Sequence, residues 1–299
     1  MTVYRLAAVL GLATMVLSAP EAMADRDVLH TERSLYQSIV VYEQGGLRCM
    51  SFYRRAVRGA RQTCMKVANP NDLIFDYTKM MTAALYVVPE PARILVIGLG
   101  GGTLPKIFEK LLPDARIDAV EVDRAVISVA DRFFGMRAHD RLRVHESDGR
   151  VFVKRAIGRG SYDLVVLDAF NQDYIPEHLL TQEFLTEVRQ LMKPGSVLAA
   201  NTYTGSALYA HESATYGAVF GQFYNLRAGS NRVIIARLGG LLSREELQRN
   251  ADRHEPALRP LGVSKDWLLS RMSTDVDWRR DVRPLTDQYS PSNLLNNHR

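Results

Sequence analysis

The 299-residue chain lacks the sequence features that mark several common enzyme classes. It has only two cysteines and no CxxC pair, which argues against a zinc site or a dithiol redox centre. HExxH and GxSxG are absent, and the seven histidines show no metal-ligand spacing. A hydrolase or a metalloenzyme is therefore not indicated, and we expect no metal ligands.

Long hydrophobic runs are also scarce. The one pronounced run lies at the start of the chain. Arg5 precedes the apolar run Leu6–Leu17, and Ala22-Met23-Ala24 resembles a small-x-small cleavage site. The run is too short to span a bilayer comfortably. We expect a signal peptide over 1–24 and a periplasmic or secreted protein; the alternative is an uncleaved N-terminal membrane anchor.

A basic stripe is missing as well, although the formal net charge is +5. Lysine and arginine are scattered along the chain and do not alternate with aromatic residues as in nucleic-acid-binding surfaces. We therefore predict no nucleic-acid partner. The sequence leaves open whether the chain forms a homodimer.

The most informative stretch is 93–123, which reads as strand, glycine turn, helix and strand. The apolar run Ile94–Ile97 is typical of a strand buried on both faces. A turn of four glycines within five residues follows, and Thr103 is expected to cap the next helix. A second strand, 117–122, ends in Glu121-Val122-Asp123. An acidic residue about 20 positions beyond a glycine turn commonly binds a ribose hydroxyl. The pattern predicts a nucleotide- or nucleoside-binding βαβ unit.

The glycine turn does not fit the usual phosphate-binding motifs. Gly98 and Gly100 start a G-x-G-x-x-G/A fingerprint, but Thr103 occupies the last position. No Lys-Ser/Thr pair follows, so a P-loop is not indicated. A turn this rich in glycine lets a ligand lie directly on the backbone, which suits an adenosyl sulfonium compound. The alternative is a connection that only allows close helix packing.

Strand and helix patterns continue to alternate after this unit, and they predict a mostly parallel, doubly wound α/β sheet. Ligands collect at the carboxyl ends of such strands, which brings the glycine turn close to Glu121, Asp148 and Asp168. The predicted strands are 94–97, 117–122, 141–145, 162–167, 196–202, 223–226 and 232–237. The predicted helices are 73–88, 125–134, 151–157, 181–192, 207–220 and 243–250.

The N-terminal part reads as β-hairpins, with strands predicted at 34–42, 47–54 and 61–67. Cys49 and Cys64 would face each other if the second hairpin turns near Ala56-Val57. Two such cysteines are expected to pair in an oxidising compartment, and the alternative is a pair of free buried thiols. The predicted organisation is a signal peptide (1–24), a β-hairpin region (25–70), an α/β domain (71–240) and a C-terminal segment (241–299).

The loop after the strand at 162–167 carries Asp168, Asp173 and Glu177. Together with Asp148 these carboxylates predict an acidic mouth that would attract a cationic substrate. A carboxylate could also accept the proton of an attacking amine. The alternative for Asp173 and Glu177 is a solvated acidic loop. The tail sequence LTDQYSP at 285–291 has no role that the residues themselves indicate.

In these features the chain resembles the spermidine synthase (polyamine aminopropyltransferase) family, in its divergent bacterial branch. The resemblance covers roughly 35–238 and rests on Tyr36-Gln37, the helix that contains Tyr77, and the segments VIGLGGGTL, AVEVD, SDGR, YDLVVLDAF and LMKPGSVLAAN. It implies a seven-stranded, Rossmann-like sheet of the class I methyltransferase type. It also implies transfer of an aminopropyl group from decarboxylated S-adenosylmethionine, a co-substrate, to putrescine or a similar amine, with no tightly bound cofactor.

The resemblance further implies a set of donor-binding residues. Glu121 would bind the ribose hydroxyls, Asp148 with Gly149 would contact the adenine, and the glycines would lie under the methionine-derived part. The full set is Gln37, Tyr77, Gly98, Gly100, Gly101, Glu121, Asp148 and Gly149.

On the amine side, the resemblance implies that Asp168 is the catalytic acid/base and anchors the amine, with Asp173 as a second acid. Asn201 falls near a family glutamine. Two departures concern amine recognition: the turn reads GLGGG where the family usually has GGGDGG, and D-A-F-N-Q-D replaces D-S-x-D-P. Two alternatives therefore remain beside the aminopropyltransferase. One is an S-adenosylmethionine-dependent methyltransferase, and the other is a non-catalytic exported protein that binds polyamines or a nucleoside.

Overall fold

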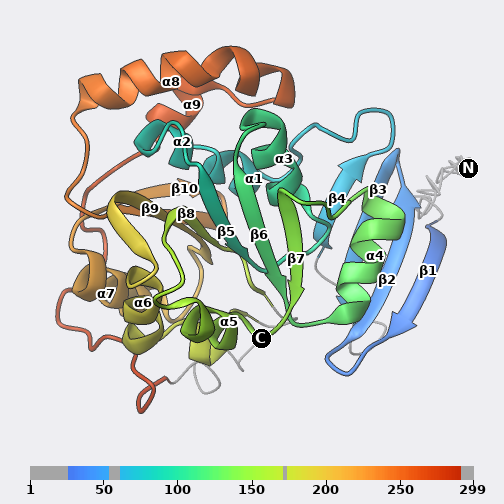
Figure 1. The fold of residues 1–299 in the computed structure, drawn as a ribbon, viewed down its shortest axis with the longest axis horizontal. Coiled ribbons are helices and arrows are strands. Elements are labelled where there is room, and N and C mark those ends of the chain that lie inside the picture. Colours follow the sequence, from blue (N-terminus) through green and yellow to red (C-terminus); the bar gives the residue numbers. More distant parts are fainter. Residues whose placement is uncertain (1–25, 54–60, 171–173, 291–299) are drawn as a thin grey trace, which may run out of the picture.

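The computed structural model describes residues 26–53, 61–170 and 174–290, and it contains two β-sheets (Figure 1). The smaller, N-terminal sheet is antiparallel and has the order β1-β2-β3-β4. Its strands are β1 (Asp27–Arg33), β2 (Ser38–Gln44), β3 (Leu47–Tyr53) and β4 (Arg61–Lys66). The predicted signal peptide and the predicted turn at 56–57 lie outside the described residues.

The larger sheet has seven strands in the order β10-β11-β9-β8-β5-β6-β7. The strands from β9 to β7 are parallel, and β10 and β11 close the sheet as an antiparallel pair. The predicted doubly wound, mostly parallel sheet is thus confirmed. Its strands are β5 (Arg93–Ile97), β6 (Arg116–Glu121), β7 (Leu142–Glu146), β8 (Tyr162–Leu167), β9 (Met192–Tyr203), β10 (Phe223–Ala228) and β11 (Asn231–Arg237).

Helices cover both faces of the larger sheet. One face is covered by α1 (Asp76–Met81), α2 (Ala84–Val87), α3 (Thr103–Leu111), α8 (Arg244–Leu258) and α9 (Lys265–Leu269). The other is covered by α5 (Gly149–Ala156), α6 (Gln182–Arg189) and α7 (Tyr209–Phe220). Two short 3-10 helices, η1 (Glu177–Leu179) and η2 (Arg259–Leu261), are also present. No helix in the described ranges is long and apolar enough to span a membrane.

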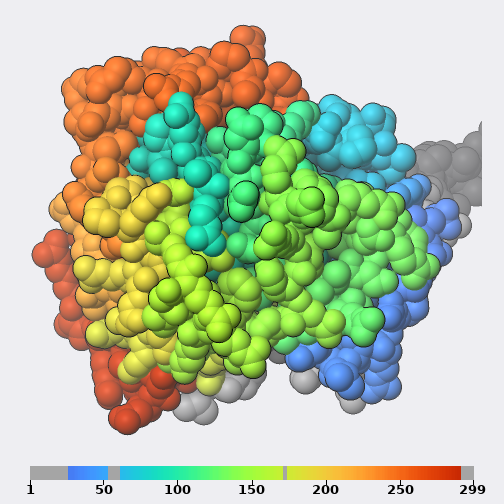
Figure 2. Space-filling model, in the orientation of Figure 1, coloured from blue at the N-terminus to red at the C-terminus, as the bar shows by residue number. Residues whose placement is uncertain are grey.

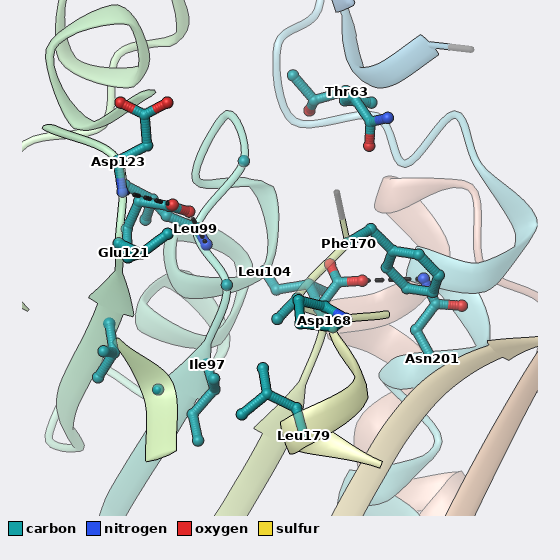
Figure 3. Close-up of a pocket in the computed structure, with 18 of the residues that line it drawn as sticks. Thr63, Ile97, Leu99, Leu104, Glu121, Asp123, Asp168, Phe170, Leu179 and Asn201 are labelled. Atoms are coloured by element: carbon teal, nitrogen blue, oxygen red, sulfur yellow. Dashed lines mark hydrogen bonds between the residues drawn. The ribbon is translucent and has the colours of Figure 1, made fainter. Parts of the chain in front are cut away.

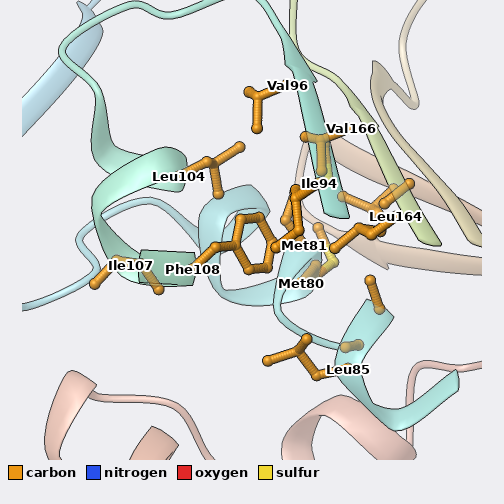
Figure 4. Packing of buried hydrophobic residues seen from close by; sticks show 14 of the residues in the cluster. Met80, Met81, Leu85, Ile94, Val96, Leu104, Ile107, Phe108, Leu164 and Val166 are labelled. Atoms are coloured by element: carbon orange, nitrogen blue, oxygen red, sulfur yellow. The ribbon is translucent and has the colours of Figure 1, made fainter. Parts of the chain in front are cut away.

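The apolar core lies between the sheet and these helices, and it explains why the central strands are so hydrophobic. All six residues of β8 are buried, because helices cover both faces of this strand. In Figure 4, Phe108 of α3 points toward Ile94 of β5, with Met80 and Met81 of α1 beside it. This packing holds the start of α3, and with it the glycine turn, against the carboxyl end of β5.

The helix α4 (Arg124–Phe134) joins the two sheets. Its residues Val126, Val129 and Phe134 are buried against an apolar face of the N-terminal sheet formed by Ile39, Val41, Met50 and Phe52. Figure 2 shows the N-terminal strands, in blue, closely packed against the green α4 region. The N-terminal sheet is therefore held beside the carboxyl ends of β5 and β6.

The two cysteines form a disulfide, as the sequence predicts. Cys49 of β3 lies opposite Cys64 of β4, and the two are joined with a Cα–Cα distance of 4.1 Å. The bond ties together the two strands next to the glycine turn.

Several predicted boundaries were wrong, for physical reasons. The helix predicted over 73–88 is two short helices, α1 and α2, joined by a turn at Thr82-Ala83. The helix predicted to run to Met192 ends at Arg189, because Met192 already pairs with Tyr162 in the sheet. The strand β1 was not predicted, since its residues are mostly exposed and show no apolar alternation.

Candidate active site

A cleft of about 400 Å³ opens at the carboxyl ends of the parallel strands. Its floor comes from the ends of β5, β6 and β8, and residues 36–37 and 61–63 of the N-terminal sheet region line it as well. The size suits a small organic ligand. Figure 3 shows Glu121 and Asp123 on one side of this space, Asp168 and Asn201 on the other, and Thr63 above.

The glycine turn lines the cleft, and at two of its positions a side chain would not fit. Gly98 has φ +95°, and a Cβ on it would lie 2.3 Å from the backbone oxygen of Asp168. A Cβ on Gly101 would lie 2.6 Å from Cγ2 of Thr63. Gly100, with φ +52°, has nothing within 4 Å of its would-be Cβ, so its backbone faces open space. The backbone of the turn is thus exposed to a ligand.

The predicted cap of α3 was wrong. Gly102, in a left-handed conformation with φ +74°, occupies the N-cap position, and Thr103 is the first helical residue. The hydroxyl of Thr103 instead lies 3.3 Å from the hydroxyl of Thr63, within hydrogen-bonding distance. This contact links the N-terminal sheet to the helix that follows the glycine turn.

Glu121, at the end of β6, is held by backbone amides. The amide of Leu99 donates to its Oε2 at 3.1 Å, and the amide of Asp123 donates to its Oε1 at 3.0 Å. Burial raises the pKa of Glu121, and these two hydrogen bonds oppose the rise. Asp123 is nearly fully buried; it caps α4 through the amide of Ala125 and accepts a hydrogen bond from Ser34. Glu121, and not Asp123, is therefore the carboxylate of this pair that is available to a ligand.

Asp148 follows β7 and caps α5. Its Oδ1 accepts from the amide of Val151 at 2.9 Å, and its Oδ2 lies 2.8 Å from Nε2 of His178. Burial tends to raise the pKa of Asp148, but the Val151 and His178 hydrogen bonds outweigh it and leave the pKa below the usual value. Gly149 packs closely against Ile97, since a Cβ on it would lie 2.6 Å from Cγ2 of Ile97.

Asp168 lies directly beyond β8 and faces the cleft. The side-chain amide of Asn201, at the end of β9, donates to its Oδ1 at 2.9 Å, and the hydroxyl of Tyr77 on α1 also donates to it. Burial raises the pKa of Asp168 to about 7, although both hydrogen bonds oppose the rise. The structure therefore places in the cleft a carboxyl group that changes protonation near neutral pH, as general acid/base chemistry requires.

Aromatic side chains surround the same end of the cleft. Phe170 and Tyr203 both line it, with ring centroids 5.1 Å apart, and Tyr174 packs against both rings. Burial raises the pKa of Tyr203, and the nearby Asp168 raises it further. An aromatic wall beside a carboxylate suits a substrate that is cationic at its end and aliphatic along its length.

Comparisons with known proteins decide the family. Residues 74–225 match the spermine/spermidine synthase domain. A polyamine aminopropyltransferase of Vibrio vulnificus is 44% identical over 286 residues, covering 93% of this chain and 95% of the relative. The chain belongs to the spermine/spermidine synthase family.

Solved structures agree with this fold. A probable spermidine synthase from Corynebacterium glutamicum has a TM-score of 0.65 and 19% identity, covering 85% of this chain and 98% of that one. Human methyltransferase-like protein 13, in complex with SAH, has a TM-score of 0.56 and 25% identity, covering 70% and 97%. The Rossmann-like, class I methyltransferase type of sheet is therefore confirmed for this member of the spermidine synthase family.

The site residues implied by the resemblance to the spermidine synthase family come together in the cleft. The cleft is lined by every one of them within the described residues: Gln37, Tyr77, Gly98, Gly100, Gly101, Glu121, Asp148, Gly149 and Asp168. Their binding and catalytic roles remain predictions. Asp173 lies outside the described residues. Glu177, the first residue of the 3-10 helix η1, does not line the cleft. Its two neighbours, Pro176 and His178, do line it.

Sequence reasoning missed several residues of the cleft. Thr63 and Arg61 come from β4, which the sequence places near the site only through the family resemblance. Phe170 lies just beyond β8, and Tyr203 is the last residue of β9. Because ligands bind at the carboxyl ends of parallel strands, both residues could have been predicted. Among the described residues, no group of three or more His, Cys, Asp or Glu could hold a metal ion.

Proposed function

We propose that this chain is a polyamine aminopropyltransferase that moves an aminopropyl group from decarboxylated S-adenosylmethionine to putrescine or a similar amine. Membership of the spermine/spermidine synthase family supports the reaction class. The observation that carries the proposal is the position of Asp168: it faces the cleft, hydrogen-bonded to Asn201 and Tyr77, with its pKa raised to about 7.

The donor would occupy the side of the cleft formed by β5, β6 and β7. Glu121 would bind the ribose hydroxyls through the lone pairs that remain on its two carboxylate oxygens, each of which already accepts one backbone amide. The open backbone at Gly100 would lie under the chain that leads to the sulfonium. The adenine would lie near Asp148 and Gly149. No tightly bound cofactor is required, since the donor is a co-substrate.

The amine would enter on the side of the cleft formed by Asp168, Phe170 and Tyr203. The sulfonium makes the adjacent aminopropyl carbon electrophilic, and the neutral amine attacks that carbon. A carbon–nitrogen bond forms, the carbon–sulfur bond breaks, and methylthioadenosine leaves. Asp168 accepts the proton that the new ammonium group loses. The rest of the cleft contributes alignment of the two substrates.

Release of methylthioadenosine tests this function directly. The purified chain, incubated with decarboxylated S-adenosylmethionine and putrescine, should release methylthioadenosine and form spermidine, both measured by chromatography. Asp168→Asn should slow the release by about 10²- to 10⁴-fold while calorimetry still shows binding of methylthioadenosine. Binding of spermidine without any binding of nucleoside would instead favour a non-catalytic polyamine-binding protein.

A second candidate function is methyl transfer from S-adenosylmethionine. The glycine turn lacks the aspartate usual in the aminopropyltransferases, and Arg61 lines the cleft, where its cation would suit a donor that keeps its carboxylate. Calorimetry with S-adenosylmethionine and its decarboxylated form separates the two functions. Tighter binding of the carboxylated donor, weakened in Arg61→Gln, would favour the methyltransferase.

We also propose that the chain is exported and cleaved after Ala24. The Cys49–Cys64 disulfide supports this location, because disulfides persist mainly in oxidising compartments. A reporter fused to residues 1–30 and the N-terminal sequence of the exported protein test it. An uncleaved N-terminal anchor would appear as intact, membrane-associated chain. A homodimer stays a prediction, which light scattering of the purified chain tests.

A further inference from the structure

The tail segment 285–287, part of the LTDQYSP sequence, packs against the elements that border the cleft. In Figure 1 the red C-terminal chain passes beside α7 and α6. Leu285 is fully buried in a cluster with Tyr174, Leu180 and Leu208. The amide of Gln182 donates to the carbonyl of Leu285 at 2.8 Å, and the amide of Leu285 donates to the hydroxyl of Thr215, also at 2.8 Å. The segment is thus an integral part of the fold.

Asp287 makes the most specific contacts of this segment. Arg150 donates two parallel hydrogen bonds to it, Nη1 to Oδ1 and Nη2 to Oδ2, both 2.7 Å long. The hydroxyl of Thr181 donates to Oδ1 at 2.7 Å. Arg150 also binds Glu187 through Nε at 2.8 Å and Nη2 at 2.9 Å, and its side chain is only 11% exposed. The arginine of this pair is largely buried and the Asp287 side chain is 42% exposed; the two parallel bonds make the pair more specific than a singly bonded surface ion pair.

The two partners of Asp287 belong to two different walls of the cleft. Arg150 directly follows Asp148-Gly149 at the start of α5, and Thr181 follows His178-Leu179 and caps α6. All four of these neighbouring residues line the cleft. The two walls also contact each other directly, through the pair formed by His178 and Asp148, 2.8 Å apart. Glu187 of α6 also binds Arg150, so Asp287 adds a second carboxylate that connects the two walls, this one from the tail.

We propose that Asp287 is a positioning residue that sets the separation of these two walls and so shapes the nucleoside end of the cleft. This inference rests on the proposed function, because it assigns that end to the adenosine part of the donor. Without the Asp287 carboxylate, the start of α5 and the segment before α6 would share no partner from the tail. The walls would then move more freely, and the nucleoside would bind less tightly because binding would have to order them.

The test compares Asp287→Asn with Asp281→Asn. Asparagine keeps the size of the side chain but has only one oxygen, so it cannot accept both Arg150 bonds. Asp281 is a matched control on the same tail, since its side chain is 78% exposed and pairs only with the exposed Arg279. For Asp287→Asn we expect Kd for methylthioadenosine to rise about tenfold while kcat at saturating donor changes less than about twofold. Asp281→Asn should match the wild type in both.

Hydrogen exchange of the ligand-free protein gives a second measurement that does not depend on nucleoside binding. The amides of 179–182 and 152 should exchange faster in Asp287→Asn, and Thr181→Ser, which keeps the hydroxyl, should behave like the wild type. Unchanged exchange, or unchanged Kd, in Asp287→Asn would overturn the proposal. A wild-type chain that binds no methylthioadenosine would refute the proposed function, and the exchange experiment would still decide whether Asp287 holds the two walls.

Discussion

The pH dependence of the reaction should reveal the ionisation of Asp168. Burial raises its pKa from the ordinary 3.8 to about 7, so the carboxyl is mostly protonated below pH 7 and mostly ionised above it. Only the ionised form can accept a proton from the amine. Activity should therefore fall as the pH falls through about 7, where an ordinary aspartate would remain ionised.

The steepness of the pH profile depends on how many groups must lose a proton before the reaction can occur. The acceptor amine must also be neutral, and its own pKa is about 10, as for a lysine side chain. A plot of log kcat/KM against pH should rise with a slope of about two below pH 7 and about one between pH 7 and 10. Asp168→Asn should lose the break at pH 7, and kcat should fall by about 10²- to 10⁴-fold.

Chromatographic measurement of methylthioadenosine release between pH 5.5 and 9.5 provides the assay. Calorimetry should show that Asp168→Asn binds methylthioadenosine within about twofold of the wild type, which separates lost chemistry from lost binding. A wild-type profile that passes through pH 7 without a break would refute the assignment. An Asp168→Asn variant with wild-type rate would refute it too.

The stability of the protein offers an independent check of the same group. Because the folded-state pKa of Asp168 lies above its unfolded value, the folded state binds the proton more tightly than the unfolded state does. The contribution of this group to stability is thus fully present below about pH 4 and is lost as the pH rises through about 7. Thermal unfolding of the wild type should show this loss relative to Asp168→Asn.

Three further predictions concern the same cleft. Tyr77→Phe should move the break in the pH profile above 7, because the lost hydrogen bond favours the ionised form of Asp168; a break at an unchanged pH would contradict this. Gly98→Ala should destabilise the fold by about 3 kcal/mol or more in urea unfolding, since its Cβ would collide with backbone, whereas Gly100→Ala should cost only about 1 kcal/mol. Equal costs would show that the close approach is not the reason for the glycine. Cys49→Ser should lower the free energy of unfolding by about 3 kcal/mol under oxidising conditions, with no difference from wild type in reductant.

Local patterns predicted the central part of the fold well. The strands at 94–97 and 162–167 were found almost to the residue, because both faces of these strands are buried and their sequences are continuously apolar. Because the carboxyl ends of parallel strands meet at one edge of the sheet, the glycine turn, Glu121 and Asp168 were expected to lie close together, and all of them line the cleft. The predicted start of the helix at 243–250 was also right, because Ser243 and Glu246 form a capping box there, whereas α8 continues to Leu258.

Features that depend on distant contacts could not be predicted in this way. Met192 joins the sheet because it pairs with Tyr162, and the preceding helical pattern gives no sign of that pairing. Nothing local indicates that Asp287 binds Arg150, which lies 137 residues earlier. The strand β1 is held mainly by its backbone pairing to β2, and backbone pairing leaves little trace in side-chain composition.

The division of the cleft between two groups of strands has a consequence for redesign. The ends of β5 to β7 supply the half proposed for the donor, and Asp168, Phe170 and Tyr203 supply the half proposed for the amine. Under this proposal the acceptor could be exchanged by altering the two aromatic rings alone. A library randomised at Phe170 and Tyr203 would sample new amines while the recognition of the sulfonium donor stays intact.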